Sequence, residues 1–175
     1  MSHLPRPAAR PLAPIVDDLT GVASDHLFWH LLSKAVQRAE RHASNLALLA
    51  IYVQGLSALN EKHGVDAGDA ALRVVASRLS SRLRKSDSVA RLGGPKFAVL
   101  VEAMTEDADV QLVAESLIAT LGEPIPTVDG DVRIGVSIGI ALYPRTAGTP
   151  DALLSAAVTA MDEAVAIGPN AYRLA

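Results

Sequence analysis

The chain has 175 residues, and half of them are hydrophobic, which is enough apolar surface for one compact domain with a sizeable core. Its formal net charge of -3 gives no broad basic field of the kind that attracts nucleic acid or anionic lipid, so we expect neither as a partner. The lack of cysteine excludes disulfides and cysteine-based metal sites. No run approaches the ~20 apolar residues of a membrane span, and prolines interrupt the N-terminus where a signal peptide needs its apolar segment. These features predict a soluble, cytoplasmic domain.

The N-terminal third begins with an arm and continues into a helix and a strand. Residues 1–16 are rich in Pro, Arg and Ala without periodicity, which is typical of a flexible arm, so the folded domain is predicted over 17–175. Apolar residues recur at helical spacing over 27–39, which predicts an amphipathic helix. The continuous apolar run 46–53 has the length of a strand that is covered on both faces.

The middle of the chain predicts two helices and a hairpin. Residues 56–62 suit a short helix, which would end near His63, and Gly68 with Asp69 is expected to open a longer helix. Two short β-prone runs, 89–92 and 97–101, are separated by Gly-Gly-Pro-Lys. This pattern predicts a β-hairpin with its turn at 93–96.

The C-terminal part predicts a capped helix, a strand, a second capped helix and an edge strand. Thr105 is the expected N-cap of the first helix. The run 132–142 alternates strictly between large apolar residues and mostly small ones, and the small side chains on the second face should let a helix approach closely. Thr149 followed by Pro150 predicts the start of the last helix, and 172–174 suits an edge strand. The hairpin excludes a purely parallel sheet, so the predicted class is α+β, with a mostly antiparallel central sheet flanked by helices.

Several segments, taken in order, resemble the GGDEF family of bacterial diguanylate cyclases. They are Asp17-Asp18-Leu19-Thr20-Gly21, Asn60 with Gly64 and Gly68-Asp69, Arg84-Lys85-Ser86-Asp87, Ala90-Arg91-Leu92-Gly93-Gly94-Pro95-Lys96-Phe97, Val136-Ser137-Ile138-Gly139-Ile140-Ala141, and Ala160-Met161 with Ala164 and Gly168. Any one of these would be weak, but so many in order and at the expected spacing are specific, and together they cover 17–175. The resemblance implies the nucleotidyl-cyclase-like fold.

The resemblance also implies an activity, the condensation of two GTP molecules into cyclic di-GMP, which needs divalent metal and cations on the outer phosphates. The family's two metal-binding carboxylates correspond here to Tyr52 and Pro95, and the acid that follows in the hairpin corresponds to Lys96. Tyr and Pro supply no carboxylate, and Lys reverses the charge.

Three phosphate-holding cations of the family correspond to Ser57, where the family usually has a lysine, and to Val165 and Pro169. These substitutions fall in four separate segments whose neighbouring residues match the family, so a single error in aligning one motif would not produce them. The resemblance therefore predicts a degenerate GGDEF domain that is not an enzyme, with no catalytic residues, no metal and no cofactor. The degenerate hairpin is Gly93, Gly94, Pro95, Lys96 and Phe97.

Asn60 and Asp69 match the family's guanine-recognising residues, and an amide with a carboxylate suits the guanine edge. They would form a vestigial guanine site. The alternative, which we favour at this point, is structural: Asn60 ends a short helix and Asp69 caps the next one.

Arg84 and Asp87 match the arginine and aspartate of the family's inhibitory product site, which binds cyclic di-GMP. Arg offers a planar fork to phosphate or guanine, and Asp accepts from guanine N–H groups. The alternative is an i,i+3 ion pair worth only a few tenths of a kcal/mol. Both interpretations stay open.

Two functions from different classes follow. The first is a signalling receptor for cyclic di-GMP that passes its state to a protein partner or through a homodimer. The second is a protein-interaction or dimerisation module that binds no nucleotide.

Overall fold

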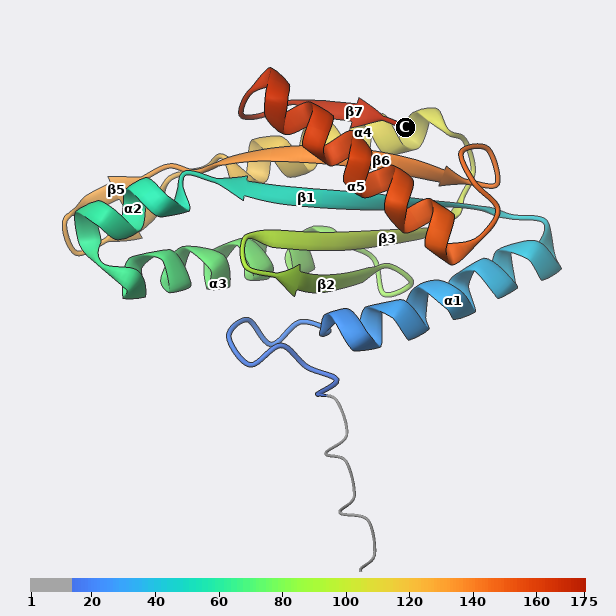
Figure 1. The fold of residues 1–175 in the computed structure, drawn as a ribbon, viewed down its shortest axis with the longest axis horizontal. Helices are drawn as coiled ribbons and strands as arrows, with labels where there is room; N and C mark the ends of the chain where they lie inside the picture. Colours follow the sequence, from blue (N-terminus) through green and yellow to red (C-terminus); the bar gives the residue numbers. More distant parts are fainter. Residues whose placement is uncertain (1–13) are drawn as a thin grey trace, which may run out of the picture.

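The computed structural model describes residues 14–175 as a five-stranded sheet with helices on both faces and a small separate hairpin (Figure 1). In chain order the elements are α1 (Asp25–His42), β1 (Asn45–Gln54), α2 (Leu56–His63), α3 (Val65–Arg82), β2 (Ser88–Gly93), β3 (Lys96–Met104), α4 (Ala108–Leu121), β4 (Ile125–Thr127), β5 (Gly130–Val132), β6 (Gly135–Tyr143), α5 (Pro150–Ile167) and β7 (Tyr172–Leu174).

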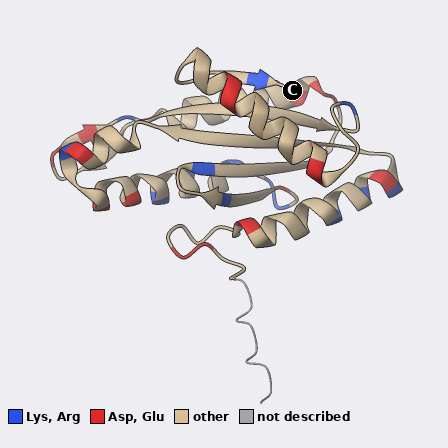
Figure 2. Cartoon of the chain, in the orientation of Figure 1, with Lys and Arg blue, Asp and Glu red and all other residues tan. Residues whose placement is uncertain are grey.

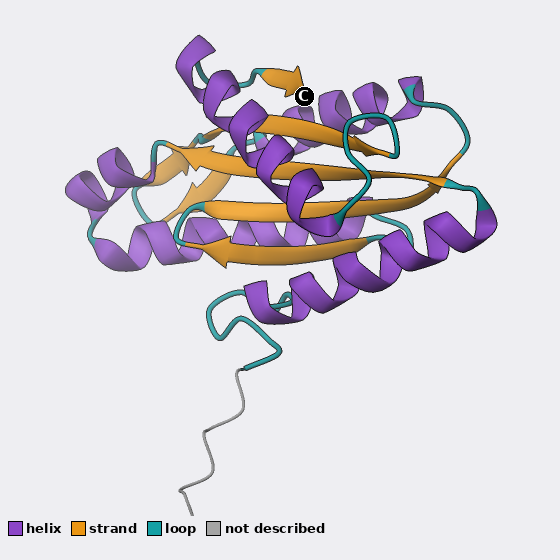
Figure 3. Cartoon of the chain, turned by 45° about the vertical axis from the view of Figure 1, so that its right-hand side comes forward, coloured by secondary structure: helices purple, strands orange, loops and turns teal. Residues whose placement is uncertain are grey.

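The sheet has the order β2-β3-β1-β6-β7, and every pairing except the parallel pair β6–β7 is antiparallel. This confirms the predicted α+β class. β1 lies at the centre, where neighbours on both sides and helices on both faces bury its whole apolar run from Leu46 to Ile51. Alternation along a strand sends successive side chains to opposite faces. Leu49 therefore packs with α3 and α4, while Leu48 packs with α1 and α5. Figure 3 shows helices on both faces of the sheet.

The predicted alternating strand is confirmed in its faces and corrected in its extent. Its large residues, from Ile134 to Leu142, lie in the core on the α3 and α4 side. The opposite face is small because α5 crosses it closely: a Cβ on Gly139 would collide with the carbonyl of Ala157 and the amide of Met161. The run is not one strand, however. It breaks at 133–134, since β5 turns away to pair with β4 while β6 pairs with β1.

The hairpin β2–β3 is confirmed, and α5 begins as predicted, with the Thr149 hydroxyl accepting from the amide of Ala152. Two predicted helix starts are wrong. α3 begins at Val65, three residues before Gly68, and α4 begins after Asp107 rather than with a Thr105 cap. α3 starts earlier than predicted because residues 65–67 are already helical after Gly64. α4 starts later, because its N-cap position is Asp107 and the residues before Thr105 belong to β3. Neither N-cap residue makes a side-chain hydrogen bond to its helix.

The described part of the predicted N-terminal arm, residues 14–16, contacts the domain, and residues 1–13 lie outside the described residues. The Ser24 hydroxyl donates to the carbonyl of Pro14 at 2.7 Å, and Val16 forms an antiparallel bridge to Ala23. Ala23 in turn forms a parallel bridge to Ala90, so this loop covers the outer edge of β2. Within 14–175, no helix has both the length and the apolar character that crossing a bilayer requires.

Candidate functional site

The turn of the β2–β3 hairpin lies against the end of β1. A two-residue turn, Gly94-Pro95, joins the strands, and Gly94 has φ +53°, which favours glycine. The Pro95 carbonyl accepts a 2.8 Å hydrogen bond from the amide of Val53. Tyr52 is paired with Lys96 across β1 and β3, and facing residues of an antiparallel pair share one side of the sheet. Tyr52 and Lys96, two of the three residues that the resemblance placed at the family's metal and acid positions, are therefore neighbours.

A cavity of about 570 Å³ opens beside this turn. Seven of the positions singled out from the sequence line it: Tyr52, Ser57, Asn60, Asp69, Gly94, Pro95 and Val165. Lys96 and Pro169, also singled out, do not. The end of β1, the turn of the hairpin, and helices α2, α3 and α5 thus bring residues from five segments to one place.

The charges of this cavity are few. Among the described residues that line it, Asp69 is the one acid and Arg91 the one base, and the remaining polar side chains are neutral. Figure 2 shows acidic and basic residues interspersed along the described part of the chain. The cavity can therefore offer hydrogen bonds to a ligand, but little positive potential to a polyphosphate.

Arg91 is a cavity residue that the sequence analysis did not single out. Its Nε donates to the Gly94 carbonyl at 3.0 Å, and its Nη1 lies 3.2 Å from Oδ1 of Asp17. Burial acts to raise the pKa of Asp17, but hydrogen bonds from Thr20 and the charge of Arg91 outweigh it and hold that pKa below its ordinary value. Arg91 and Asp17 both belong to the motifs quoted for the family resemblance. Only the fold shows that these residues, 74 positions apart in the sequence, are in contact.

Asn60 and Asp69 lie together, and the capping roles expected for them are wrong. Asn60 is inside α2, and its Oδ1 accepts a 2.9 Å hydrogen bond from the amide of Gly68. A Cβ on Gly68 would collide with this side chain, so the glycine makes room for Asn60 between α2 and α3. Asp69 lies in the second turn of α3 and caps nothing. Asn60 thus fixes the α2–α3 junction while both side chains line the cavity.

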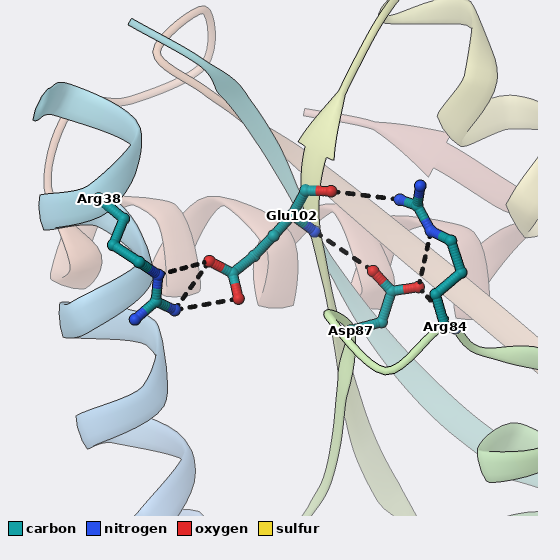
Figure 4. A network of polar contacts seen from close by, with 4 residues as sticks. All are labelled: Arg38, Arg84, Asp87 and Glu102. Atoms are coloured by element: carbon teal, nitrogen blue, oxygen red, sulfur yellow. Dashed lines mark hydrogen bonds and ion pairs between the residues drawn. The ribbon is translucent and has the colours of Figure 1, made fainter. Parts of the chain in front are cut away.

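Arg84 and Asp87 form a separate turn between α3 and β2 (Figure 4). The Asp87 side chain is only 4% exposed, and its carboxylate accepts from the amides of Arg84 at 3.0 Å and Glu102 at 3.4 Å. The Arg84 guanidinium is 63% exposed. Its Nε lies 3.5 Å from Asp87, and its Nη2 donates to the Glu102 carbonyl at 3.2 Å. The i,i+3 ion pair considered from the sequence is therefore present, between the buried carboxylate of Asp87 and the exposed guanidinium of Arg84.

Glu102 extends this network to the first helix. Its carboxylate receives a bidentate contact from Arg38 of α1, with Nη2 at 2.8 and 3.0 Å from the two oxygens (Figure 4). The next residue, Ala103, has φ +53° where the β1–β3 register shifts, so a bulge sets the direction of Glu102. No motif in the sequence pointed to Arg38 or Glu102.

Comparison with known proteins adds the following. The family description "Diguanylate cyclase, GGDEF domain" matches residues 14–171. The chain is 42% identical over 146 residues to the diguanylate cyclase TpbB of Pseudomonas aeruginosa, which is 83% of this chain and 34% of that protein. It is 38% identical over 156 residues to MucR of the same species, a bifunctional diguanylate cyclase/cyclic di-GMP phosphodiesterase, covering 89% of this chain and 23% of MucR. The chain thus spans about a third or less of the length of these curated relatives.

Solved structures show the same fold. The GGDEF domain of TpbB superposes with a TM-score of 0.88 at 40% identity, covering 91% of this chain and 94% of that one. The GGDEF domain of DgcB from Caulobacter crescentus, in complex with c-di-GMP, has a TM-score of 0.85 at 22% identity, covering 99% and 97%. At that identity the second likeness concerns the fold alone.

Proposed function

The chain belongs to the GGDEF family of diguanylate cyclase domains, and from that premise we propose that it is a catalytically inactive member that acts as a regulatory domain. The observation that carries the proposal is the lining of the 570 Å³ cavity. Where the family places two metal-binding carboxylates, this chain has Tyr52 and Pro95, and the acid that follows in the hairpin is Lys96.

These residues do not fit a divalent metal. Mg²⁺ is held by carboxylates and phosphate oxygens, whereas a proline side chain offers no ligand and a neutral phenol is a poor one. The cavity retains a single carboxylate, Asp69, on the α3 side, and the Lys96 backbone pairs directly with that of Tyr52. The positive charge of Lys96 would also repel a divalent metal ion at the hairpin.

GTP should also bind weakly. Ser57 and Val165, where the family has phosphate-holding cations, line the cavity without charge, and Arg91 is already paired with Asp17. Charge-assisted hydrogen bonds contribute ~1.5–3 kcal/mol each, so the loss of several lowers affinity by orders of magnitude.

The test is a search for product. Incubation with GTP and Mg²⁺ or Mn²⁺ should yield no cyclic di-GMP above a no-enzyme control, by chromatography. A variant with Tyr52→Asp, Pro95→Asp and Lys96→Glu should stay inactive, because Ser57, Val165 and Pro169 still supply no cation. Product from the wild-type chain would overturn the inactive assignment, and product from the triple variant would show that the phosphate positions are assigned wrongly.

As the ligand we propose cyclic di-GMP, bound at the Arg84–Asp87 turn. The exposed guanidinium of Arg84 supports this, because its position is set from behind by Asp87 and by the Glu102 carbonyl while its outer edge faces solvent. A pre-positioned guanidinium suits bidentate contact with a phosphate or with guanine. The DgcB domain, which has this fold, is bound to the same ligand.

Asp87 has a different part in this proposal from Arg84. Because its carboxylate is buried and accepts two backbone amides, its main contribution is to hold the turn and orient the arginine. We expect ligand contact to fall chiefly on Arg84, with Asp87 adding an acceptor for guanine N–H groups at its remaining lone pairs.

The second candidate is an interaction or dimerisation module that binds no nucleotide. The ion pair between Arg84 and Asp87 favours it, since that pair accounts for both residues without a ligand. Titration with cyclic di-GMP separates the two candidates.

A further inference from the structure

A second, mostly apolar groove lies on the other side of α3 from the hairpin cavity. It has a volume of about 600 Å³ and runs between the first half of α3 and the β4–β5 hairpin. The α3 wall consists largely of small residues, Ala67, Ala70, Ala71 and Val74, and the facing wall includes Ile125, Pro126 and Val132. At the hairpin tip the side chain of Val128 is fully exposed. Exposed apolar surface in a formed groove is typical of an interaction site.

The rim of this groove is acidic. Asp66 and Asp129 line the groove, and none of the described residues that line it is Lys or Arg. A third acid, Asp131, is exposed on the adjoining strand β5. The one basic side chain is His63, whose Nδ1 lies 2.9 Å from Oδ2 of Asp129. A partner that buries the apolar floor will therefore meet negative charge at the edges, which favours Lys and Arg in that partner.

The geometry restricts the form of the partner. β4 contains Pro126, which has no N–H to offer, so an added strand would find an interrupted edge. Residues 66–74 of α3 extend about 12 Å at 1.5 Å per residue, which matches two to three turns of a helix laid alongside. A second copy of this chain is disfavoured, because a two-fold contact would set the acidic rim against itself.

We propose that the groove between α3 and the β4–β5 hairpin docks an amphipathic helix of a partner protein, whose apolar stripe fills the groove and whose Lys or Arg residues face Asp66 and Asp131. Small side chains on α3 let such a helix approach closely, as in other helix-in-groove complexes. This inference rests on the proposed regulatory role, because a regulatory domain needs a protein partner. It does not depend on cyclic di-GMP binding.

The position of the groove connects it to the hairpin cavity. α2 and α3 carry Asn60 and Asp69 into the cavity, while His63, Asp66 and Ala70 of the same helices line the groove. The Asn60–Gly68 hydrogen bond joins the two helices between these surfaces. A helix bound in the groove would therefore rest on the element that shapes the cavity.

The test uses a labelled synthetic helix of about 18 residues, or five turns, with Leu at i, i+3, i+4 and i+7 and Lys on both flanks. Its binding to the chain is measured by fluorescence anisotropy. Ala70→Arg, an exposed change in the groove, should weaken binding at least tenfold. Ala119→Arg, the same change at an exposed position of α4 outside the groove, should not alter it. Replacing Lys by Glu in the peptide should also weaken binding at least tenfold.

Four results would overturn the proposal. The first is no binding of the Lys peptide up to about 1 mM. The second is equal binding of the Lys peptide by Ala70→Arg and wild type, and the third is equal binding of the Glu and Lys peptides by wild type. The fourth is self-association of the wild-type chain that Ala70→Arg abolishes, since that would assign the groove to a second copy. If Ala70→Arg fails to fold by circular dichroism, Asp131→Lys at the exposed hairpin replaces it, with the same expected loss. Cyclic di-GMP titration of the Ala70→Arg chain should match wild type, so failure here is distinct from failure at Arg84.

Discussion

Two aspartates, Asp17 and Asp87, each use a carboxylate to hold a loop against the sheet. Asp17 binds Thr20 in its own loop and Arg91 on β2, and Asp87 accepts amides from its own turn and from β3. Both side chains are largely buried, at 19% and 4% exposed. The two carboxylates therefore contribute to the stability of the fold and also to the shape of the two candidate sites.

Asp17 should make stability depend on acid pH. Its pKa is lowered in the folded chain, so its contribution is fully present above the unfolded-state value of about 3.9 and is lost as pH falls through the folded-state value. Urea unfolding of wild type and Asp17→Asn from pH 7 to pH 3 should show wild type more stable at pH 7, with the difference shrinking below about pH 4. A difference that grows on acidification would contradict this assignment.

Asp87→Ala should destabilise the chain by about 1–3 kcal/mol, because it leaves two backbone amides without their acceptor. Denaturant unfolding measures the change. Lys85→Ala, at an exposed position of the same turn, is the control and should stay within about 0.5 kcal/mol of wild type. Equal effects of the two substitutions would mean that the carboxylate does not hold the turn.

Among the elements, the contact of α5 with β6 depends most clearly on side-chain size. Gly139 faces the backbone of α5 at Ala157 and Met161, so the strand and the helix approach to backbone contact. The small face of β6 was visible in the sequence as an alternation of large and small residues, and it predicted this approach.

Gly139→Ala should cost about 1–3 kcal/mol or more, since backbone rather than a flexible side chain must move. Gly148→Ala serves as the matched control, because a Cβ there meets nothing within 4 Å. Thermal unfolding should show a lower Tm for the first variant and little change for the second. An unchanged Tm for Gly139→Ala would contradict the close packing.

Sequence periodicity predicted which face of each element is buried better than where the element ends. The apolar positions around Ile138 and Leu49 were assigned to strands correctly, because burial of one face imposes the pattern. The break at 133–134 and the start of α3 at Val65 were missed, because pairing with β4 and the α2–α3 junction decide them. Contacts such as Arg38–Glu102, 64 residues apart, leave no local pattern.

At the scale of the whole molecule, the two candidate sites lie at opposite ends of β2. The hairpin turn follows Gly93, and the Arg84–Asp87 turn precedes Ser88, which places them about 17 Å apart along a six-residue strand. Under the proposed function, this separation lets the hairpin end lose catalysis while the Arg84–Asp87 turn at the other end binds its ligand. The motifs identified both turns from the sequence, while the burial of Asp87 and the pairing of Arg91 required the fold.

Calorimetric titration of cyclic di-GMP into wild type, Arg84→Ala and Asn60→Ala tests the central claim most directly. Wild type should bind, Arg84→Ala should bind tenfold to a hundredfold more weakly, equivalent to roughly 1.5–3 kcal/mol for a charged donor, and Asn60→Ala should match wild type. No heat and no thermal shift for wild type up to about 100 μM ligand, where binding near −5.5 kcal/mol is visible, would contradict the receptor function and leave the interaction module. Equal affinity of Arg84→Ala and wild type would remove the site from this turn.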